Sequence, residues 1–167
     1  MAAMQEHMIR YFSAEKNESL IFVSVGVLAL ALGAWLLVRG QATGYRGMAY
    51  PLIAIALIQI SVGGSVYLRT DAQVAALRAQ HERDPAAFRA AEGARMEKVM
   101  RAFATYKVAE IVLFAVGVAL TYAFRRREGL YAAGIGLIIQ SGIMLTLDLF
   151  AERRGDAWLA AVRALLE

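Results

Sequence analysis

Four long stretches of this chain are almost wholly apolar and contain no lysine or arginine, and they limit its possible folds more than any other feature. They cover residues 19–38, 48–68, 108–124 and 130–150. Each is long enough, or nearly so, to cross a hydrocarbon core of about 30 Å as a helix. The sequence therefore predicts an all-α integral membrane protein with four transmembrane helices, and it argues against a soluble globular domain.

The charged residues, 19% of the chain, lie almost entirely between these four stretches. Four crossings would leave both termini and the long middle segment on one side of the membrane. Thirteen of the 18 Lys and Arg residues fall on that side, although Arg125, Arg126 and Arg127 fall on the other. The positive-inside rule then predicts that both termini are cytoplasmic and that the protein lies in an inner, or plasma, membrane.

The two halves of the chain share residues at fixed spacings. The spacing is 91 residues around the first and third spans, and 81 in the second and fourth spans, where Tyr50 matches Tyr131 and Gln59 matches Gln140. The pairs that keep the spacing of 91 are Glu6 and Glu97, Arg10 and Arg101, Phe12 and Phe103, and Lys16 and Lys107. We interpret this pattern as a tandem duplication of one helical hairpin. Because each copy crosses the membrane twice, the two repeats are expected to be parallel.

The sequence thus predicts a single membrane domain made of two repeats. Repeat 1 covers about 4–81, a linker covers about 82–94, and repeat 2 covers about 95–167. Amphipathic cytoplasmic helices are expected at about 4–15, 71–81, 86–106 and 157–166. The pair Asp84-Pro85 is expected to separate two helices, since Asp caps a helix N-terminus and Pro fits its first turn.

Two glutamines are the main polar residues in the middle of the predicted spans, Gln59 in the second and Gln140 in the fourth. An amide in hydrocarbon must find a partner, and a polar contact across a helix interface contributes about 0.6 to 2 kcal/mol. One interpretation is that the two amides hold the helices together. The other is that they line a polar pocket for a ligand with their small neighbours Ser61 and Ser141.

A second set of polar residues is expected to form a belt at the cytoplasmic boundary of the bundle. Lys107 or Arg69 is the natural counter-charge for Asp148 in this belt. Mutual neutralisation explains such a belt, but if it lined an opening it would bind an ion or an anionic head group. No ionisable residue lies in the central part of any span, which disfavours an ion-coupled antiporter. The belt consists of Glu18, Arg69, Lys107, Glu110 and Asp148.

The composition excludes several classes of chemistry. The chain has no cysteine and two histidines, so it offers neither a disulfide, a thiolate metal site nor a His pair at ligand spacing. It has no phosphate-binding loop, no HExxH motif and no nucleophile elbow, so we assign no catalytic residue, metal or cofactor. Its net charge of +4 comes from Arg residues that flank the spans. The expected partner is therefore a bilayer with anionic lipids, and not a nucleic acid.

Two functions remain open from the sequence. The first is a small non-enzymatic membrane protein that binds or conducts a small solute or lipid through its polar midplane as a homo-oligomer. The alternative is an interaction module without transport, such as an accessory subunit, a regulator or an immunity-type protein that acts on another membrane protein. A dry, packed midplane would favour the module. A lipid-modifying enzyme ranks last, because no nucleophile or metal set supports it.

Overall fold

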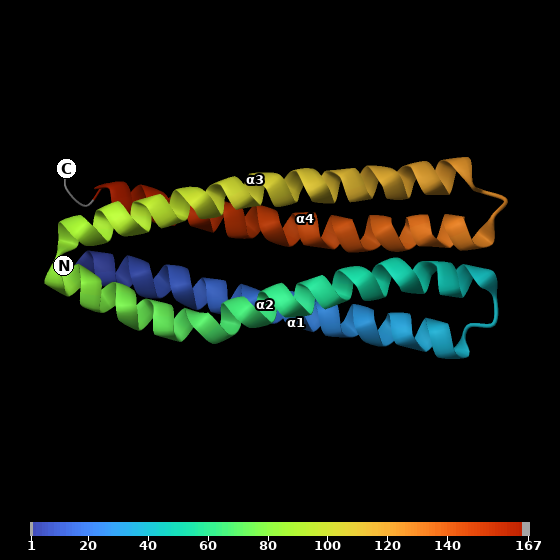
Figure 1. Ribbon diagram of the computed structural model, residues 1–167, viewed down its shortest axis with the longest axis horizontal. Helices are drawn as coiled ribbons and strands as arrows, with labels where there is room; N and C mark the ends of the chain where they lie inside the picture. The colour runs from blue at the N-terminus through green and yellow to red at the C-terminus, as the bar shows by residue number, and fades with distance from the viewer. Residues whose placement is uncertain (1, 165–167) are drawn as a thin grey trace.

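The computed structural model describes residues 2–164, and it is built from four long helices. They are α1 (Ala2–Arg39), α2 (Thr43–Arg83), α3 (Pro85–Ala123) and α4 (Glu128–Arg163) (Figure 1). All four are long and apolar enough to span a membrane. The described part of the chain is thus all-α, as the sequence predicts, with one helix for each apolar stretch.

Each helix is much longer than a membrane crossing requires. With 38 residues, α1 is about 57 Å long, whereas the hydrocarbon core is about 30 Å thick. The expected amphipathic helices are not separate segments, because 4–15, 71–81, 86–106 and 157–163 continue the four long helices. Residues 165 and 166, also assigned to the last of them, lie outside the described residues.

The segment between the two hairpins is short. Helix α2 ends at Arg83 and α3 begins at Pro85, so most of the expected linker 82–94 is helical. The Asp84 side chain accepts a hydrogen bond of 2.9 Å from the backbone N–H of Ala87, and Pro85 occupies the first turn of α3. Asp84 and Pro85 therefore separate two helices by the capping that the sequence predicts.

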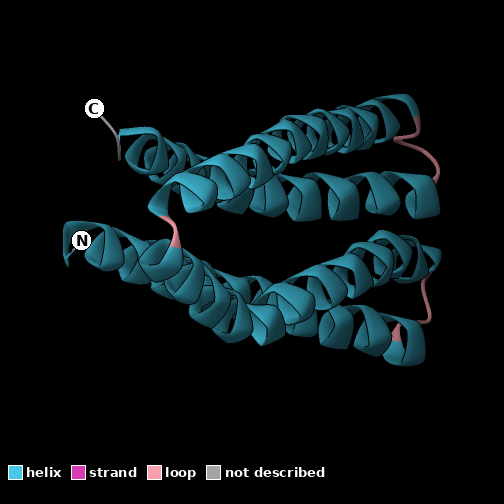
Figure 2. Ribbon diagram, turned by 60° about the vertical axis from the view of Figure 1, so that its left-hand side comes forward, coloured by secondary structure: helices cyan, strands magenta, loops and turns pink. Residues whose placement is uncertain are grey.

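The four helices form two hairpins that lie side by side. Helix α1 packs along α2 and α3 packs along α4, while α2 and α4 join the hairpins at the centre. The N-terminus, the described end of α4 and the α2–α3 connection share one end of the bundle, which we call the terminal end; the two short turns lie at the other (Figures 1 and 2). This topology matches a chain that crosses a membrane four times.

Glycines let the helices of each hairpin approach closely. A Cβ atom on Gly26 of α1 would lie 2.9 Å from the Ile60 side chain of α2, and one on Gly117 of α3 would lie 2.8 Å from the carbonyl oxygen of Gly134 of α4. Neither position accepts a larger residue without movement of the neighbouring helix. The two glycines are 91 residues apart, so a close helix contact occurs at equivalent positions of α1 and α3, but the partner residues on α2 and α4 are not equivalent.

The largest cluster of buried apolar side chains lies at the terminal end, beyond the predicted spans. Its centre is aromatic: the rings of Tyr11 and Trp158 stack with centroids 5.4 Å apart, and Phe12 meets both rings edge-on. In the spans, by contrast, many large apolar side chains face outward, such as Leu28, which is 71% exposed. The buried cluster, which we call the terminal core, consists of Met4, Met8, Tyr11, Phe12, Leu77, Phe88, Met96, Trp158, Leu159 and Val162.

Candidate functional site

The two midplane glutamines lie against each other where α2 meets α4. The Nε2 atom of Gln140 donates a hydrogen bond of 2.7 Å to Oε1 of Gln59. Both side chains are completely enclosed, with exposed fractions of 1% and 0%. The structure therefore brings together the two amides that the sequence places at equal depth.

The two serines do not complete a polar pocket around this amide pair. Ser141 is buried, but its Oγ donates to the carbonyl oxygen of Leu137 in its own helix at 2.5 Å. Ser61 is exposed on the outer face of α2. Two residues correspond to a rotation of about 200° around a helix, so Ser61 points away from Gln59. Of the four expected ligand-binding residues, only the glutamines meet.

One amide nitrogen of the pair donates no hydrogen bond to the described part of the chain. The Nε2 group of Gln59 is buried and has no hydrogen-bond partner among the described residues. A primary amide carries two N–H donors, and leaving them unpaired in an apolar interior costs free energy. The two side chains are therefore enclosed and bonded to each other, while the Nε2 group of Gln59 on α2 stays unbonded among the described residues.

Two of the five belt residues form ion pairs that tie helices together at the terminal side of the spans. Lys107 of α3 donates to Glu152 of α4 at 2.7 Å, and Glu18 of α1 pairs with Arg154 of α4. Beside the belt, Lys16 of α1 contacts Asp71 of α2 at 2.5 Å. These pairs neutralise part of the belt, whereas Arg69, Glu110 and Asp148 form no ion pair among the described residues.

Arg69 and Asp148 do not pair in the way that the sequence suggests. Lys107 is engaged by Glu152, which lies one turn beyond Asp148 on α4. Arg69 is exposed, and the carboxyl group on which its charge acts is Glu15. Of the two expected counter-charges of Asp148, Lys107 is therefore used by Glu152, and Arg69 stays exposed without an ion pair among the described residues.

Asp148 instead faces a second acid, Glu110 of α3. The two carboxyl groups lie within hydrogen-bonding reach of each other. Glu110 is only 2% exposed, and neither of its carboxylate oxygens receives a hydrogen bond from any described residue. Two acids in contact, one of them enclosed, form the most unusual electrostatic arrangement in the spans.

The sequence analysis missed a polar network inside the terminal core. The Glu92 side chain is fully buried and accepts a 2.7 Å hydrogen bond from Nε1 of Trp158. Arg95, one turn along α3, donates to both of its oxygens at 2.7 Å. The spacing of Glu92 and Arg95 is visible in the sequence, but their contact with a residue 66 positions away is not.

Burial changes the acidity of two groups beside this network. It raises the pKa of the Tyr11 hydroxyl, with the nearby Glu15 charge adding to the effect. Burial also raises the pKa of the Glu15 carboxyl, although Arg95, Arg69 and Arg154 lower it in part. Both groups lie at the terminal core and not beside the amide pair.

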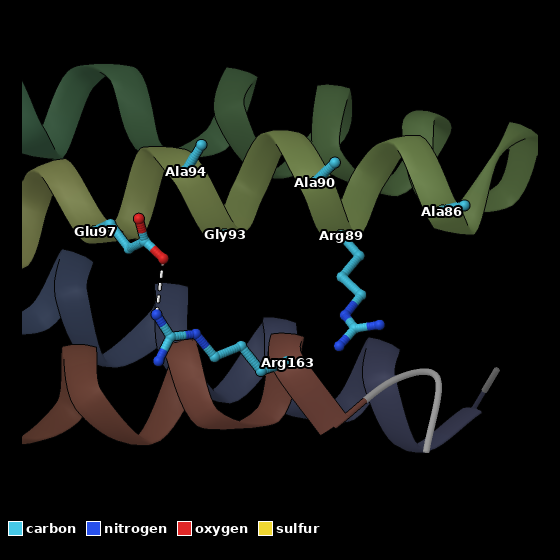
Figure 3. A pocket seen from close by; sticks show the side chains of 7 residues that line it. All are labelled: Ala86, Arg89, Ala90, Gly93, Ala94, Glu97 and Arg163. Carbon is cyan, nitrogen blue, oxygen red and sulfur yellow. Dashed lines mark hydrogen bonds and ion pairs between the residues drawn. The ribbon is translucent and has the colours of Figure 1, made fainter.

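The two best-formed recesses of the described surface lie away from the midplane. The larger, of about 460 Å³, is lined by α3 and by Arg163 of α4 (Figure 3). Arg163 crosses it to pair with Glu97 at 2.7 Å, and Ala90 and Ala94 project from one side of α3 (Figure 3). Its residues on α3 are Ala86, Arg89, Ala90, Gly93, Ala94 and Glu97.

Comparisons with protein-family models, with characterised proteins and with solved structures give no match for this chain.

Proposed function

We propose that this chain is a non-enzymatic interaction module of the inner (plasma) membrane that works as a homo-oligomer, with both termini cytoplasmic. The distribution of Lys and Arg supports this orientation. The termini and the α2–α3 connection lie at the same end of the bundle, which supports four crossings (Figure 1). The ion pairs on the side of the termini also leave basic residues such as Arg69 exposed for anionic lipids.

The proposal includes the tandem duplication. Lys16 pairs with Asp71 in the first hairpin, and Lys107 pairs with Glu152 in the second. The two lysines are 91 residues apart and the two acids are 81 apart, which are the spacings of the sequence pattern. The Gln59–Gln140 bond also joins residues 81 apart. These repeated contacts support a pseudo-two-fold axis between α2 and α4.

The observation that carries the proposed function is the outward face of α3. Of the most apolar 18 residues of α3, only 11% are buried inside the bundle. The corresponding share is 22% to 28% in the other three helices. Small exposed residues follow this face, at Ala115 and Ala119 in the predicted span and at Ala104 just before it. Small residues let helices approach closely in a bilayer, where packing drives their association.

The same face continues beyond the span into the larger recess. Ala86, Ala90 and Ala94 lie on the side of the α3 helix that also carries Ala104 and Ala115, because the helix repeats every 3.6 residues. Glu97 and Arg101 lie on this face as well, and they are charges of opposite sign one turn apart. A second copy of α3 running parallel would meet both a small-residue surface and complementary charges.

Cysteine cross-linking tests this assembly directly, because the natural chain has no cysteine. In Ala115→Cys the thiol lies on the outward face of α3, and in the matched control Leu28→Cys it lies on the outward face of α1. In lipid vesicles we expect an oxidised dimer with the first variant and little with the second. A monomer in both cases, or equal cross-linking, would contradict the α3 interface.

A second function is favoured by the free Nε2 group of Gln59. A solute that carries a hydrogen-bond acceptor would satisfy this donor at the midplane, as in the solute-binding hypothesis. The test is uptake or binding by vesicles that contain the wild type and the Gln59→Leu, Gln140→Leu double variant. Loss of flux in the double variant with retained folding would support a solute path over the interaction module.

A further inference from the structure

Glu110 lies inside the predicted third span, close to its terminal boundary. It is the third residue of 108–124, and it precedes Ala123, the last residue of α3 at the turn end, by 13 residues, which is about 20 Å along the helix. An enclosed carboxyl group at that depth is a functional candidate, since an isolated charge there is costly.

The charges around Glu110 give it no cation. Asp148 of α4 faces it directly, and Glu152 of α4 acts in turn on Asp148. Lys107, on α3 itself, is bound to Glu152. Among the described residues, neither carboxyl group forms an ion pair with a lysine or an arginine. The two facing acids must therefore be compensated by something other than a lysine or an arginine.

A metal ion does not fit this place. The described residues contain no group of three His, Cys, Asp or Glu side chains that could hold one. Calcium or magnesium would need six or more oxygen ligands, including waters. The atoms of the Glu110 carboxyl group are enclosed and leave no room for a hydration shell.

A proton fits the same place. If one carboxyl group of the pair is protonated, its O–H can donate to the other, so that Glu110 takes part in a hydrogen bond. The charge of the pair then changes from −2 to −1. Two carboxyl groups that share one proton are a known solution to placing two acids in contact, because both cannot ionise cheaply in a low dielectric.

We propose that Glu110 and Asp148 hold one proton between them, and that the pair is a proton-binding site near the terminal boundary of the predicted spans. The proton comes from water at the terminal end through Asp148, which is half-buried, whereas Glu110 is enclosed. The first hairpin has no such pair, because Ser19 and Tyr67 occupy the equivalent positions at the spacings of 91 and 81. The site is thus specific to the second hairpin, and it does not depend on the proposed assembly.

Infrared difference spectroscopy of the full chain in lipid nanodiscs tests this site. At neutral pH we expect a C=O band of a protonated carboxyl group that shifts in D₂O. The band should be lost in Glu110→Gln, because the amide group of this variant donates a hydrogen bond to Asp148 and the pair then needs no shared acidic proton. It should persist in the control Glu97→Gln, which alters an acid at the surface.

The second variant and a change of buffer separate the remaining outcomes. Asp148→Asn should shift or remove the band, because the partner of the Glu110 carboxyl group changes; this comparison stands even if Glu110→Gln does not fold. Replacement of sodium by choline should leave the wild-type band unchanged. The absence of a band in the folded wild type, a band unaffected by either variant, or a band that depends on sodium would overturn the proposal.

Discussion

The side-chain amide of Gln140 donates a 2.7 Å hydrogen bond to that of Gln59, so one polar contact joins the two central helices at the middle of the predicted spans. Its neighbours on both helices are apolar or bonded to their own backbone. The contact therefore links the two hairpins at a position where the lipid offers no competing partner.

The amide pair gives a prediction about stability. Replacing both Gln59 and Gln140 by Leu should lower the free energy of unfolding by only about 1 to 2 kcal/mol, because the pair is removed as a unit. The single change Gln140→Leu should cost more than the double one, since it leaves the Gln59 amide buried without a partner. Detergent-titrated unfolding followed by circular dichroism measures both, with Ser61→Ala as the control on the exposed face of α2.

A loss in the double variant equal to the sum of the losses in the two single variants would mean that the two amides act independently. A side chain directed into the lipid would give that result.

A second prediction concerns topology. Because most basic residues lie on the side of the termini, reporters fused to either end and a reporter inserted after Phe88 should all be cytoplasmic. A reporter at Gln41, in the turn between α1 and α2, should be on the opposite side. If the reporters placed the 70–106 segment and the termini on different sides of the membrane, four crossings would be excluded.

A third prediction concerns the terminal core. Trp158→Phe keeps a ring against Tyr11 but removes the N–H that Glu92 accepts. Hydrogen bonds to charged groups contribute about 1.5 to 3 kcal/mol, so the free energy of unfolding should fall by an amount in that range. Trp35→Phe is the matched control, because Trp35 is the other tryptophan of the chain and is exposed on α1. If the two substitutions lowered the free energy of unfolding equally, the hydrogen bond to Glu92 would have no role in stability.

A fourth prediction follows from the raised pKa of Glu15. The folded protein keeps the proton of Glu15 at a pH where the unfolded chain has released it. Its contribution to stability is therefore present below the ordinary pKa of a glutamate and is lost as the pH rises through the raised pKa. Glu15→Gln should flatten this decline in melting temperature, whereas Glu6→Gln, on the exposed face of α1, should leave it in place.

The helices themselves were predictable from the sequence because each apolar stretch is continuous and free of Lys and Arg. The capping by Asp84 was predictable too, since it depends on residues within one turn. The contact of Gln59 with Gln140 followed from their equal depth in the duplicated pattern. These features depend on local chemistry or on a repeated spacing.

Features that depend on the rotation of one helix against another were not predictable. Lys107 reaches Glu152 and not Asp148, a difference of one helical turn that only the packing of α3 on α4 decides. Ser61 lies on the wrong face of α2 for a pocket with Gln59, which the helical period alone could have indicated. The bond between Trp158 and Glu92 joins two helices across 66 residues.

The uninterrupted course of the helices from the predicted spans into the terminal core has a mechanical meaning. Each helix is one stiff rod, and the aromatic packing of Tyr11 and Trp158 fixes two of the four rods at one end. A small tilt there is therefore magnified at the distant turns, in proportion to the length of the lever. The terminal core is therefore the pivot of these rods, and its displacement would change the separation of the two hairpins at the turn end of the bundle.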